Sequence, residues 1–476
     1  MNSPFGSRSR RRLRLPLAVG VVVAMLAVGC SVFGDAKSSS GDCVMFGGTP
    51  SRNMVNTAAK NLPTEWSTPE KGGKNIKWVA ETGSRGYTSP VVAGGHVYVG
   101  TNNGKPRDPN ATGEKAVLMC FNEADGKFLW QITHEMPPQE IIREAKQDGL
   151  CSTPAVEGDR IYYVTPGAVV VCANSSGKVI WKVDLVKEHG VFPCYLCNCS
   201  PLIVGDLICV VTGNGRDAEN KIAAPSAPSF LALNKRTGEL EWTALRPVGD
   251  IVEGQWGNAA YDAATKGVIF PGGDGRLYVD ETIGKLQWFF DCTPKGAHAS
   301  EAAKGAQNYL IATPVVHDSR VYIGVGQNPD NGPGPGRFWC LDAKQKGKVV
   351  WQYGGPAPKG SSRDYLFGRT LSSCAVHDGL VFVAELDGFL HCFDAATGQH
   401  YWEQDLKSSI WGSPYWADGK IYLGTDDGDV HVFAAGKEKK QLAKNEIEEG
   451  VKSTLVAANG TLYVLTDRHL FAIANK

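Results

Sequence analysis

Short apolar runs separated by turn residues repeat along the chain from about residue 75 onward. The segment TSPVVAGGHVYVGT, from Thr88 to Thr101, shows the pattern: a Ser/Thr-Pro pair, an apolar run, a turn with Gly, and a second apolar run. Two β-rich runs joined by such a turn predict a β-hairpin. Eight segments of this kind occur, and they begin at Thr88, Ser152, Cys199, Gly257, Ala312, Ser372, Gly412 and Lys452.

A second recurring unit follows most of these hairpins. In FDAATGQHYW, from Phe393 to Trp402, the tight turn at Gly398 is followed four residues later by a tryptophan. Six pairs share this spacing: Gly126 and Trp130, Gly177 and Trp181, Gly238 and Trp242, Gly284 and Trp288, Gly347 and Trp351, Gly398 and Trp402. Each copy predicts two more strands. Four strands in every repeat of 40 to 64 residues are typical of a propeller blade, so we predict an all-β, eight-bladed β-propeller of four-stranded antiparallel blades.

The two ends of the repeat region are expected to pair with each other. The seventh unit ends on Leu442 where the others have Trp, and the eighth stops at Ile473 without an outer strand. The segment NIKWVAE, from Asn75 to Glu81, precedes the first hairpin and carries Trp78. We predict that it completes the eighth blade, which closes the ring and removes unpaired edges. The predicted propeller covers residues 75–476.

The N-terminal region has the pattern of an export signal. Arginines at 8–14 precede an apolar stretch from Leu15 to Val28, which predicts a signal peptide over residues 1–30. The stretch leads to Cys30 in a sequence similar to a lipoprotein box, where the cysteine is lipidated, while Ser9-Arg10-Arg11 is similar to part of a twin-arginine signal. With either signal we expect the mature protein to work outside the cytoplasm. Residues 31–74 are predicted to be a flexible tether followed by an N-terminal strap.

The charge balance excludes one class of partner. Lys plus Arg and Asp plus Glu number 49 each, so no overall positive field favours nucleic acid. We expect membrane attachment only through the N-terminal anchor.

The paired units resemble a known family. The pattern Asp-x-x-x-Gly-x-x-x-Trp, at Asp280 to Trp288 and Asp394 to Trp402, is similar to the tryptophan-docking motif of the PQQ (pyrroloquinoline quinone) type eight-bladed propellers. The resemblance covers roughly four fifths of the chain and implies that the Trp of one blade packs on the next. It implies two different functions, because the family contains PQQ-dependent dehydrogenases and also cofactor-free outer-membrane assembly lipoproteins of the BamB type.

The dehydrogenase resemblance implies a Ca²⁺ ion held between PQQ, a Glu and an Asn, with an Asp as base. Thr212-Gly213-Asn214 is similar to the phrase that supplies the Asn ligand. Val164 to Gly167 stands where the Glu ligand is expected, and only Asp250 and Glu253 are available as the catalytic base. Adjacent cysteines are absent, and so is the c-type haem signature, because Cys194-Tyr195-Leu196-Cys197 is followed by Asn198.

Residues just before the hairpins are expected to meet at one mouth of the central channel. With Asn214 they form the candidate ligand-binding set: Arg85, Tyr87, Gln255, Trp256, Arg369, Trp411 and Lys452. One interpretation is a site for a flat anionic ligand such as PQQ with calcium, since guanidinium groups pair with carboxylates and indoles stack on rings. The other is that Trp256 and Trp411 plug the channel and Arg369 caps blade carbonyls.

The cysteines fall into two groups. Cys120, Cys340 and Cys392 occupy equivalent positions in separate blades, too far apart for disulfides, and are expected to be buried apolar residues. Cys194, Cys197 and Cys199 lie close together in sequence near Cys151 at the mouth. A local disulfide is the first expectation, and a Zn²⁺ site with Cys151 or His189 as fourth ligand is the alternative.

The missing dehydrogenase residues favour a non-catalytic binding or scaffold protein of the cell envelope, similar to the BamB type. Its partner would be an envelope protein or a small anionic ligand. The alternative is a quinoprotein dehydrogenase that oxidises an alcohol or sugar at a divergent site built from Asn214, Glu253, Arg85 and Arg369.

Overall fold

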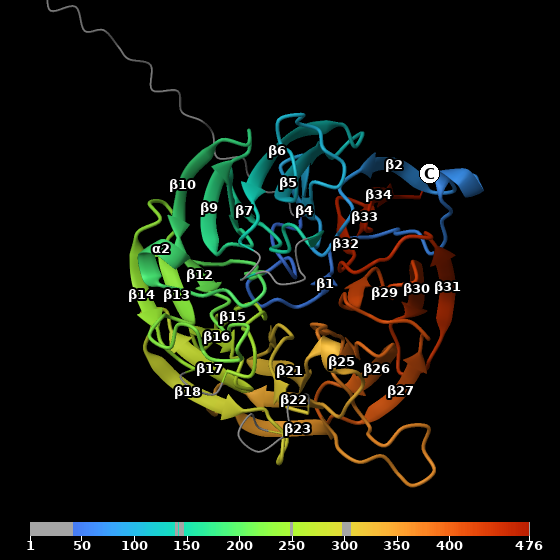
Figure 1. Ribbon diagram of the computed structural model, residues 1–476. Helices are drawn as coiled ribbons and strands as arrows, with labels where there is room; N and C mark the ends of the chain where they lie inside the picture. The colour runs from blue at the N-terminus through green and yellow to red at the C-terminus, as the bar shows by residue number, and fades with distance from the viewer. Residues whose placement is uncertain (1–40, 139–140, 142–146, 248–250, 298–305, 476) are drawn as a thin grey trace, which may run out of the picture. The chain divides into compact units, whose positions relative to one another are not determined.

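The strands predicted from the two repeated units are present in the computed structural model, which describes residues 41–138, 141, 147–247, 251–297 and 306–475. These residues belong to one compact unit, Ala36–Lys476. Successive antiparallel sheets follow one another around a ring, and the colour in Figure 1 runs once around it. The eight-bladed, all-β propeller is therefore confirmed.

Each blade is built on four antiparallel strands. Blade 1 consists of β3 Val91–Ala93, β4 His96–Asn102, β5 Lys115–Asn122 and β6 Phe128–Glu135, and blade 2 of β7 Ala155–Glu157, β8 Arg160–Val164, β9 Val169–Asn174 and β10 Val179–Asp184. Blade 3 consists of β11 Leu202–Val204, β12 Leu207–Val211, β13 Phe230–Asn234 and β14 Leu240–Ala244, and blade 4 of β15 Ala260–Asp262, β16 Gly267–Pro271, β17 Arg276–Glu281 and β18 Leu286–Asp291.

The remaining blades follow the same plan. Blade 5 consists of β20 Val315–His317, β21 Arg320–Gln327, β22 Arg337–Asp342 and β23 Lys348–Gly354, with β19 Asn308–Tyr309 also paired to β21, and blade 6 of β24 Ala375–His377, β25 Leu380–Ala384, β26 Phe389–Asp394 and β27 His400–Asp405. Blade 7 consists of β28 Tyr415–Ala417, β29 Lys420–Gly424, β30 Asp429–Ala434 and β31 Gln441–Glu446, with β1 Val55–Asn56 parallel to β28. Blade 8 consists of β32 Val456–Ala458, β33 Thr461–Leu465, β34 His469–Ile473 and β2 Ile76–Glu81.

The ring closes by pairing the two ends of the repeat region. Strand β2 runs antiparallel to β34, with Trp78 opposite Ala472, and becomes the outer strand of blade 8. In Figure 1 the blue β2 lies beside the red β34 and β33. The predicted closure is confirmed.

The Gly-to-Trp unit fastens one blade to the next. In blade 6, the Asp394 carboxylate accepts the backbone N–H groups of Ala396 and Thr397, which shapes the turn, and Gly398 takes the left-handed conformation at φ +74°. Trp351 of blade 5 covers this turn and donates its indole N–H to the Ala395 carbonyl at 3.0 Å. A Cβ on Gly398 would lie only 2.6 Å from the indole, so glycine is needed where the ring docks.

The same docking recurs around most of the ring. The pairs are Trp78 on Gly126, Trp130 on Gly177, Trp181 on Gly238, Trp242 on Gly284, Trp288 on Gly347 and Trp351 on Gly398. Because Trp78 belongs to β2, this docking also joins blade 8 to blade 1.

The joint between blades 7 and 8 lacks this tryptophan, and the segment before β2 takes its place. Trp66 is buried in the core cluster that also contains Tyr422 of blade 7 and Ile473 of blade 8. The Asn445 side chain on β31 accepts the Trp66 backbone N–H at 2.9 Å and donates to the Thr64 carbonyl at 3.0 Å. By strand register, Ala443 stands where the other blades have Trp, one residue after the Leu442 predicted from the sequence. Trp66 adds a buried indole to the core at this joint from outside the repeat.

Residues 41–56, which we call the strap, cross one end of the channel and touch every blade. In blade order from 8 through 1 to 7, the contacts are Gly41 with Asn459, Cys43 with Val92, Val44 with Val156, Arg52 with Ser200, Pro50 with Tyr261, Ser51 with Val316, Asn53 with Val376, and Met54 with Trp416. Strand β1 appears near the centre of the ring in Figure 1. One end of the channel is thus covered, which leaves the other end for a site.

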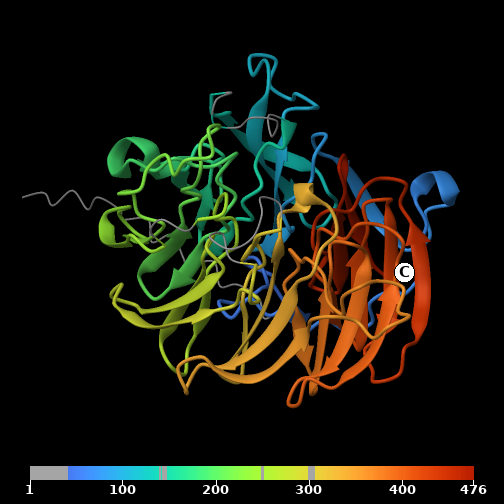
Figure 2. The same ribbon diagram turned by 60° about the horizontal axis from the view of Figure 1, so that its bottom comes forward.

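Helical segments are short and lie in connections. Those whose bounds lie within the described residues are η1 Pro69–Lys71, α2 Leu185–His189 and η3 Pro329–Asn331. Figure 2 shows the turn η3 on the upper side of the ring, among the long connections. No helix in the described residues has the length and apolar character needed to cross a membrane. The predicted signal peptide at 1–30, with Cys30, lies outside the described residues.

Candidate functional site

A belt of small polar side chains surrounds the channel, one from each blade. We define the belt as the residue in the second position of the first seven predicted hairpin segments and in the third position of the eighth: Ser89, Thr153, Ser200, Asn258, Thr313, Ser373, Ser413 and Thr454. All eight are buried. The repeated Ser/Thr-Pro pair in the sequence therefore marks a structural ring as well as the start of a strand.

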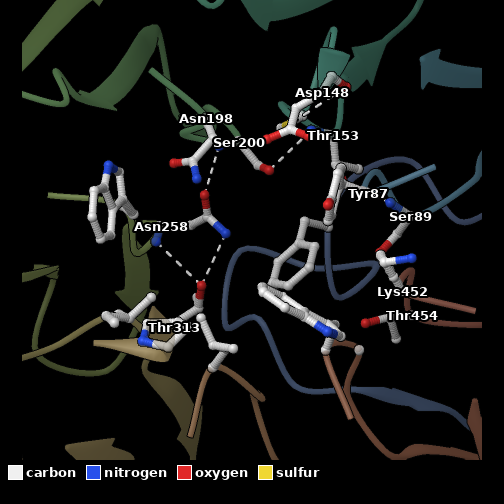
Figure 3. Close-up of a pocket in the computed structure, with 18 of the residues that line it drawn as sticks. Tyr87, Ser89, Asp148, Thr153, Asn198, Ser200, Asn258, Thr313, Lys452 and Thr454 are labelled. Carbon is white, nitrogen blue, oxygen red and sulfur yellow. Dashed lines mark hydrogen bonds between the residues drawn. The ribbon is translucent and has the colours of Figure 1, made fainter. Parts of the chain in front are cut away.

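Belt side chains join neighbouring blades. The backbone N–H of a belt residue donates a hydrogen bond to the side chain of the belt residue in the next blade. The donor and acceptor pairs are Ser89 and Thr153, Thr153 and Ser200, Ser200 and Asn258, Asn258 and Thr313, Ser373 and Ser413, and Ser413 and Thr454. Figure 3 shows Asn258 between Ser200 and Thr313, bonded to both. These bonds satisfy backbone groups that the short inner strands leave unpaired, and they tie neighbouring blades together around the channel.

A cavity of about 320 Å³ lies within the belt, and every belt residue except Ser373 lines it. Phe46 of the strap also lines it, so the strap forms its floor. Two indoles contribute to its walls. Trp256 lies edge-on to Tyr195, with ring centroids 6.0 Å apart, and Trp411 lies edge-on to Tyr87 at 6.2 Å. The indoles line the cavity and leave it open, with apolar walls above a polar belt.

The charged groups at the cavity are largely paired. Lys452 lies 2.8 Å from an Asp426 oxygen and 3.1 Å from an Asp467 oxygen. Burial opposes the charge of Lys452, but these two carboxylates outweigh burial and raise its pKa. Burial raises the pKa of Asp148, although the positive charges of Arg85 and Lys452 act to lower it. In Figure 3, Tyr87 and Lys452 face Asn198 and Asn258 across the cavity.

Two buried polar atoms at the cavity have no hydrogen-bond partner among the described residues. They are Trp411 Nε1, a donor, and Asn198 Oδ1, an acceptor. A buried unpaired polar group is costly, so each favours a water molecule or a polar ligand at this position. The site is therefore suited to a polar ligand or side chain of low net charge that also offers an apolar face.

Half of the predicted ligand-binding set lines this cavity, and half does not. Tyr87, Trp256, Trp411 and Lys452 line it. The Arg369 guanidinium binds Asp387 at 3.0 Å and also donates to the Asn328 and Pro329 carbonyls. Arg85 donates to the Ser84 carbonyl, and Gln255 donates to the Asn214 carbonyl.

The predicted catalytic and calcium-binding residues are engaged elsewhere or not described. The Asn214 amide accepts the Phe192 N–H at 3.0 Å and donates to the Ala224 carbonyl at 3.0 Å, so it holds its own loop. The Glu253 carboxylate accepts from Asn328 and from the Tyr309 hydroxyl. Asp250 lies outside the described residues.

The cysteine expectations have a mixed outcome. Cys120, Cys340 and Cys392 are buried in the blade cores, as expected. The expected local disulfide is wrong, because the structure has no disulfide among its described cysteines. Cys197 donates to the Val211 carbonyl and Cys199 accepts the Val211 N–H, so both sulfurs lie against β12. Cys151, Cys194, Cys197 and Cys199 form no group with metal-ligand spacing in the part of the chain that the structure describes.

Three features of the cavity could not be found from the pattern of residues before each hairpin. Phe46 reaches it from the strap, Asp148 from the segment after β6, and Asp330 from the η3 turn. The belt itself left a clear signal, since the belt position holds Ser or Thr in seven of the eight hairpin segments and Asn in the other.

Comparison with known sequences places the chain in a family. The profile described as "Outer membrane protein assembly factor BamB", a PQQ-type repeat family, matches residues 113–362 and 340–474. The chain belongs to this family. The match runs from just before β5 to the end of β34, and agrees with the resemblance seen in the tryptophan-docking motif.

Individual relatives differ in how much of the chain they share. The outer membrane protein assembly factor BamB of Yersinia pestis is 22% identical over 447 residues, which cover 89% of this chain and 99% of that protein. The 1-butanol dehydrogenase (cytochrome c) of Thauera butanivorans is 29% identical over 153 residues, but these span only 31% of this chain and 19% of the dehydrogenase. The quinohemoprotein alcohol dehydrogenase ADHIIG from Pseudomonas putida HK5 superposes with a TM-score of 0.62 at 15% identity, covering 92% of this chain and 80% of the enzyme, which shows a shared fold alone.

The residues present do not fit PQQ and calcium, the cofactors implied by the dehydrogenase resemblance. A polycarboxylate ligand needs unpaired cations, yet Lys452 is held by two carboxylates and the Arg369 guanidinium is paired with Asp387. A calcium site needs oxygen ligands, yet Asn214 uses both ends of its amide on backbone groups.

Proposed function

We propose that this protein is an extracytoplasmic, non-catalytic binding or scaffold protein of the cell envelope, of the BamB type, and that its partner is an envelope protein. The main support for this proposal is that the polar groups at the channel mouth form hydrogen bonds and ion pairs within the protein itself. Arg369, Asn214 and Glu253, on which a divergent dehydrogenase site would depend, all hold the protein's own loops. The near full-length similarity to BamB of Yersinia pestis supports the same proposal.

The outer surface of the ring also supports a protein partner. The large exposed apolar residues lie on or beside the outer strands of blades 1 to 5, with the exception of Val186 in α2: Leu129, Val179, Ile180, Leu240, Leu245, Ile283, Phe289, Val349 and Val350. Ile283 is 70% exposed and Phe289 is 55% exposed. The described outer strands of blades 6 and 7, β27 and β31, have no such residue. Exposed apolar groups on sheet-edge strands can supply contacts to a partner protein.

A crosslinking experiment tests the partner. A photo-crosslinking residue replaces Phe289 in the full-length chain, expressed in its native cell envelope. The control replaces Lys444, which occupies the same register position of β31, one residue after the position of the docking tryptophan. We expect a single dominant crosslink to an envelope protein of the outer-membrane assembly machinery from position 289 and none from position 444. Equal crosslinking from both positions would contradict a specific contact surface.

Enzyme assays test the alternative directly. Purified protein is mixed with PQQ and Ca²⁺, and dye-linked oxidation of alcohols and sugars is recorded beside a calorimetric titration. We expect no dye reduction and no binding up to high micromolar PQQ. Dye reduction that depends on both PQQ and Ca²⁺ would overturn the proposal in favour of a quinoprotein dehydrogenase.

A further inference from the structure

Two histidines and a glutamate meet on blade 6, away from the channel. His391 on β26 stands directly opposite Glu403 on β27, and a bulge between Cys392 and Phe393 brings His400 to the same side. His391 Nδ1 lies 3.2 Å from His400 Nε2 and 3.7 Å from a Glu403 oxygen. The three donor atoms all lie within 4.8 Å of one another.

A buried carboxylate orients the first histidine. The Glu385 carboxylate lies 2.7 Å from His391 Nε2, and both side chains are completely buried. Arg363 donates to both oxygens of Glu385, at 2.5 and 2.9 Å, which holds Glu385 as an anion. Glu385 therefore favours the tautomer with the proton on Nε2, and leaves the Nδ1 lone pair of His391 facing His400 and Glu403. Metal-bound histidines are commonly oriented by a carboxylate in this way.

The second histidine is held in a similar manner. The Tyr353 hydroxyl lies 3.4 Å from His400 Nδ1, so His400 can donate from Nδ1 and keep Nε2 as a ligand atom. Glu403 is 43% exposed, which gives its carboxylate room to adjust and gives water access to the same point.

Two of the three ligand separations are close to those around a tetrahedral ion, and the third, between His400 and Glu403, is within 4.8 Å. Ligand atoms at about 2.0–2.1 Å from tetrahedral Zn²⁺ lie about 3.3–3.4 Å apart, close to the observed separations of 3.2 and 3.7 Å. Imidazole and carboxylate are ligands that zinc accepts. We propose that His391, His400 and Glu403 form a zinc site, with Glu385 positioning His391 and a water molecule as fourth ligand.

The neighbouring blade shows that the fold does not require this set. In blade 7, His431 occupies the register position of His391, but it faces Lys444 where His391 faces Glu403. Gln441 replaces His400 and donates toward His431 Nδ1 at 3.2 Å, and Thr425 stands at the position of Glu385. Blade 7 therefore has the histidine without the other two ligands. Blade 6 differs from it at three positions, which carry the ligands His400 and Glu403 and the positioning residue Glu385.

One structural alternative remains for the same atoms. In a metal-free protein, a hydrogen-bond chain would run from Tyr353 through His400 and His391 to Glu385. That chain does not need Glu403, whereas a zinc site does. The two explanations therefore differ in what substitution of Glu403 does.

Metal titration of the full chain decides between them. The protein is stripped with chelator and titrated with Zn²⁺ by calorimetry, and with Co²⁺ while the visible absorption of a tetrahedral cobalt site is recorded. We expect one ion per chain with micromolar or tighter affinity. His400→Gln and Glu403→Gln should each weaken binding more than about 100-fold and abolish the cobalt spectrum, while Glu385→Gln should weaken it by about 10- to 100-fold.

The matched control is His431→Gln in blade 7, which should leave zinc affinity and the cobalt spectrum unchanged. Glu403 is partly exposed, so Glu403→Gln should fold, and its circular dichroism and Tm in chelator verify this. Absence of stoichiometric binding in the unsubstituted protein would overturn the proposal. Equal binding by the unsubstituted protein and Glu403→Gln would overturn it too, in favour of the hydrogen-bond chain or another site.

Discussion

At the scale of single residues, two histidines respond to pH in opposite directions. His134 on β6 is bonded to the buried Tyr163 hydroxyl at 2.8 Å, and burial, helped by Lys182, lowers its pKa to about 4. His469 on β34 lies 2.8 Å from Glu449, and the hydrogen bond to that carboxylate raises its pKa above the usual 6.5. Burial therefore dominates at His134 and charge pairing dominates at His469.

The two shifts predict opposite effects of acid. Between about pH 6.5 and 4 the unfolded chain protonates His134 before the folded protein does, so His134 lowers stability as the pH falls through this window. His469 binds its proton more tightly in the folded state, so its contribution is present below pH 6.5 and is lost as the pH rises through its folded pKa. Urea unfolding at pH 7 and pH 4.5 measures both effects.

We expect His134→Gln to reduce the acid-induced loss of unfolding free energy by about 1–2 kcal/mol relative to the unsubstituted protein. His469→Gln should increase that loss. If both substitutions changed the acid-induced loss of unfolding free energy in the same direction, burial at His134 and charge pairing at His469 could not be the causes.

At the scale of elements, the docked turn predicts which glycines are indispensable. Gly398 and Gly379 both lie in hairpin turns of blade 6, with φ of +74° and +73°, but only Gly398 has an indole above it. Gly379→Ala should cost about 1–2 kcal/mol from backbone strain alone. Gly398→Ala should cost about 1–3 kcal/mol more, because the new methyl group displaces Trp351. Equilibrium urea unfolding of the two variants compares them, and equal losses would show that docking contributes no stability.

Elements and their joints could be predicted from the sequence because their determinants are local. Asp394, Gly398 and Trp402 lie within nine residues of one another, and the turn that they specify depends on little else. The partners of Arg369 and Asn214 could not be predicted in the same way. Arg369 meets Asp387 and the η3 loop, and Asn214 meets the loop at Phe192, through connections whose paths no periodic pattern specifies.

The blade 6 cluster shows what strand register adds. His391, His400 and Glu403 lie on two adjacent strands, so the Gly-to-Trp unit already brings them near one another in sequence. The Gly-to-Trp unit alone places His400 only beside a turn. Only the pairing of His391 with Glu403, together with the bulge, reveals that three ligand atoms converge.

At the scale of the whole molecule, the strap joins what the blade repeat cannot. Each blade contacts its neighbours, but residues 41–56 contact all eight, so they couple blades on opposite sides of the ring. Arg52 is the centre of this contact. It is fully buried, and its guanidinium donates to the carbonyls of Phe46, Ser200, Pro201 and Ala259.

Arg52 is held by carbonyl oxygens and by no carboxylate among the described residues, and burial lowers its pKa to about 10, so it still carries its charge at neutral pH. Arg52→Met would leave the four carbonyls without their donor, at about 1–3 kcal/mol for each buried group left unpaired. We therefore expect it to lower the free energy of unfolding by about 3 kcal/mol or more. Arg52→Lys should recover only part of that loss, because a single ammonium cannot reach all four acceptors.

Urea unfolding followed by tryptophan fluorescence measures the loss, with Arg468→Met as the control at an arginine whose side chain is 57% exposed. The control should change stability by less than about 0.5 kcal/mol. If the strap couples the ring as a unit, Arg52→Met should keep a single transition with a lower midpoint, whereas a strap that only covers the channel would leave the midpoint where it is. If Arg52→Met and Arg468→Met have the same urea midpoint, the strap does not contribute to the stability of the propeller.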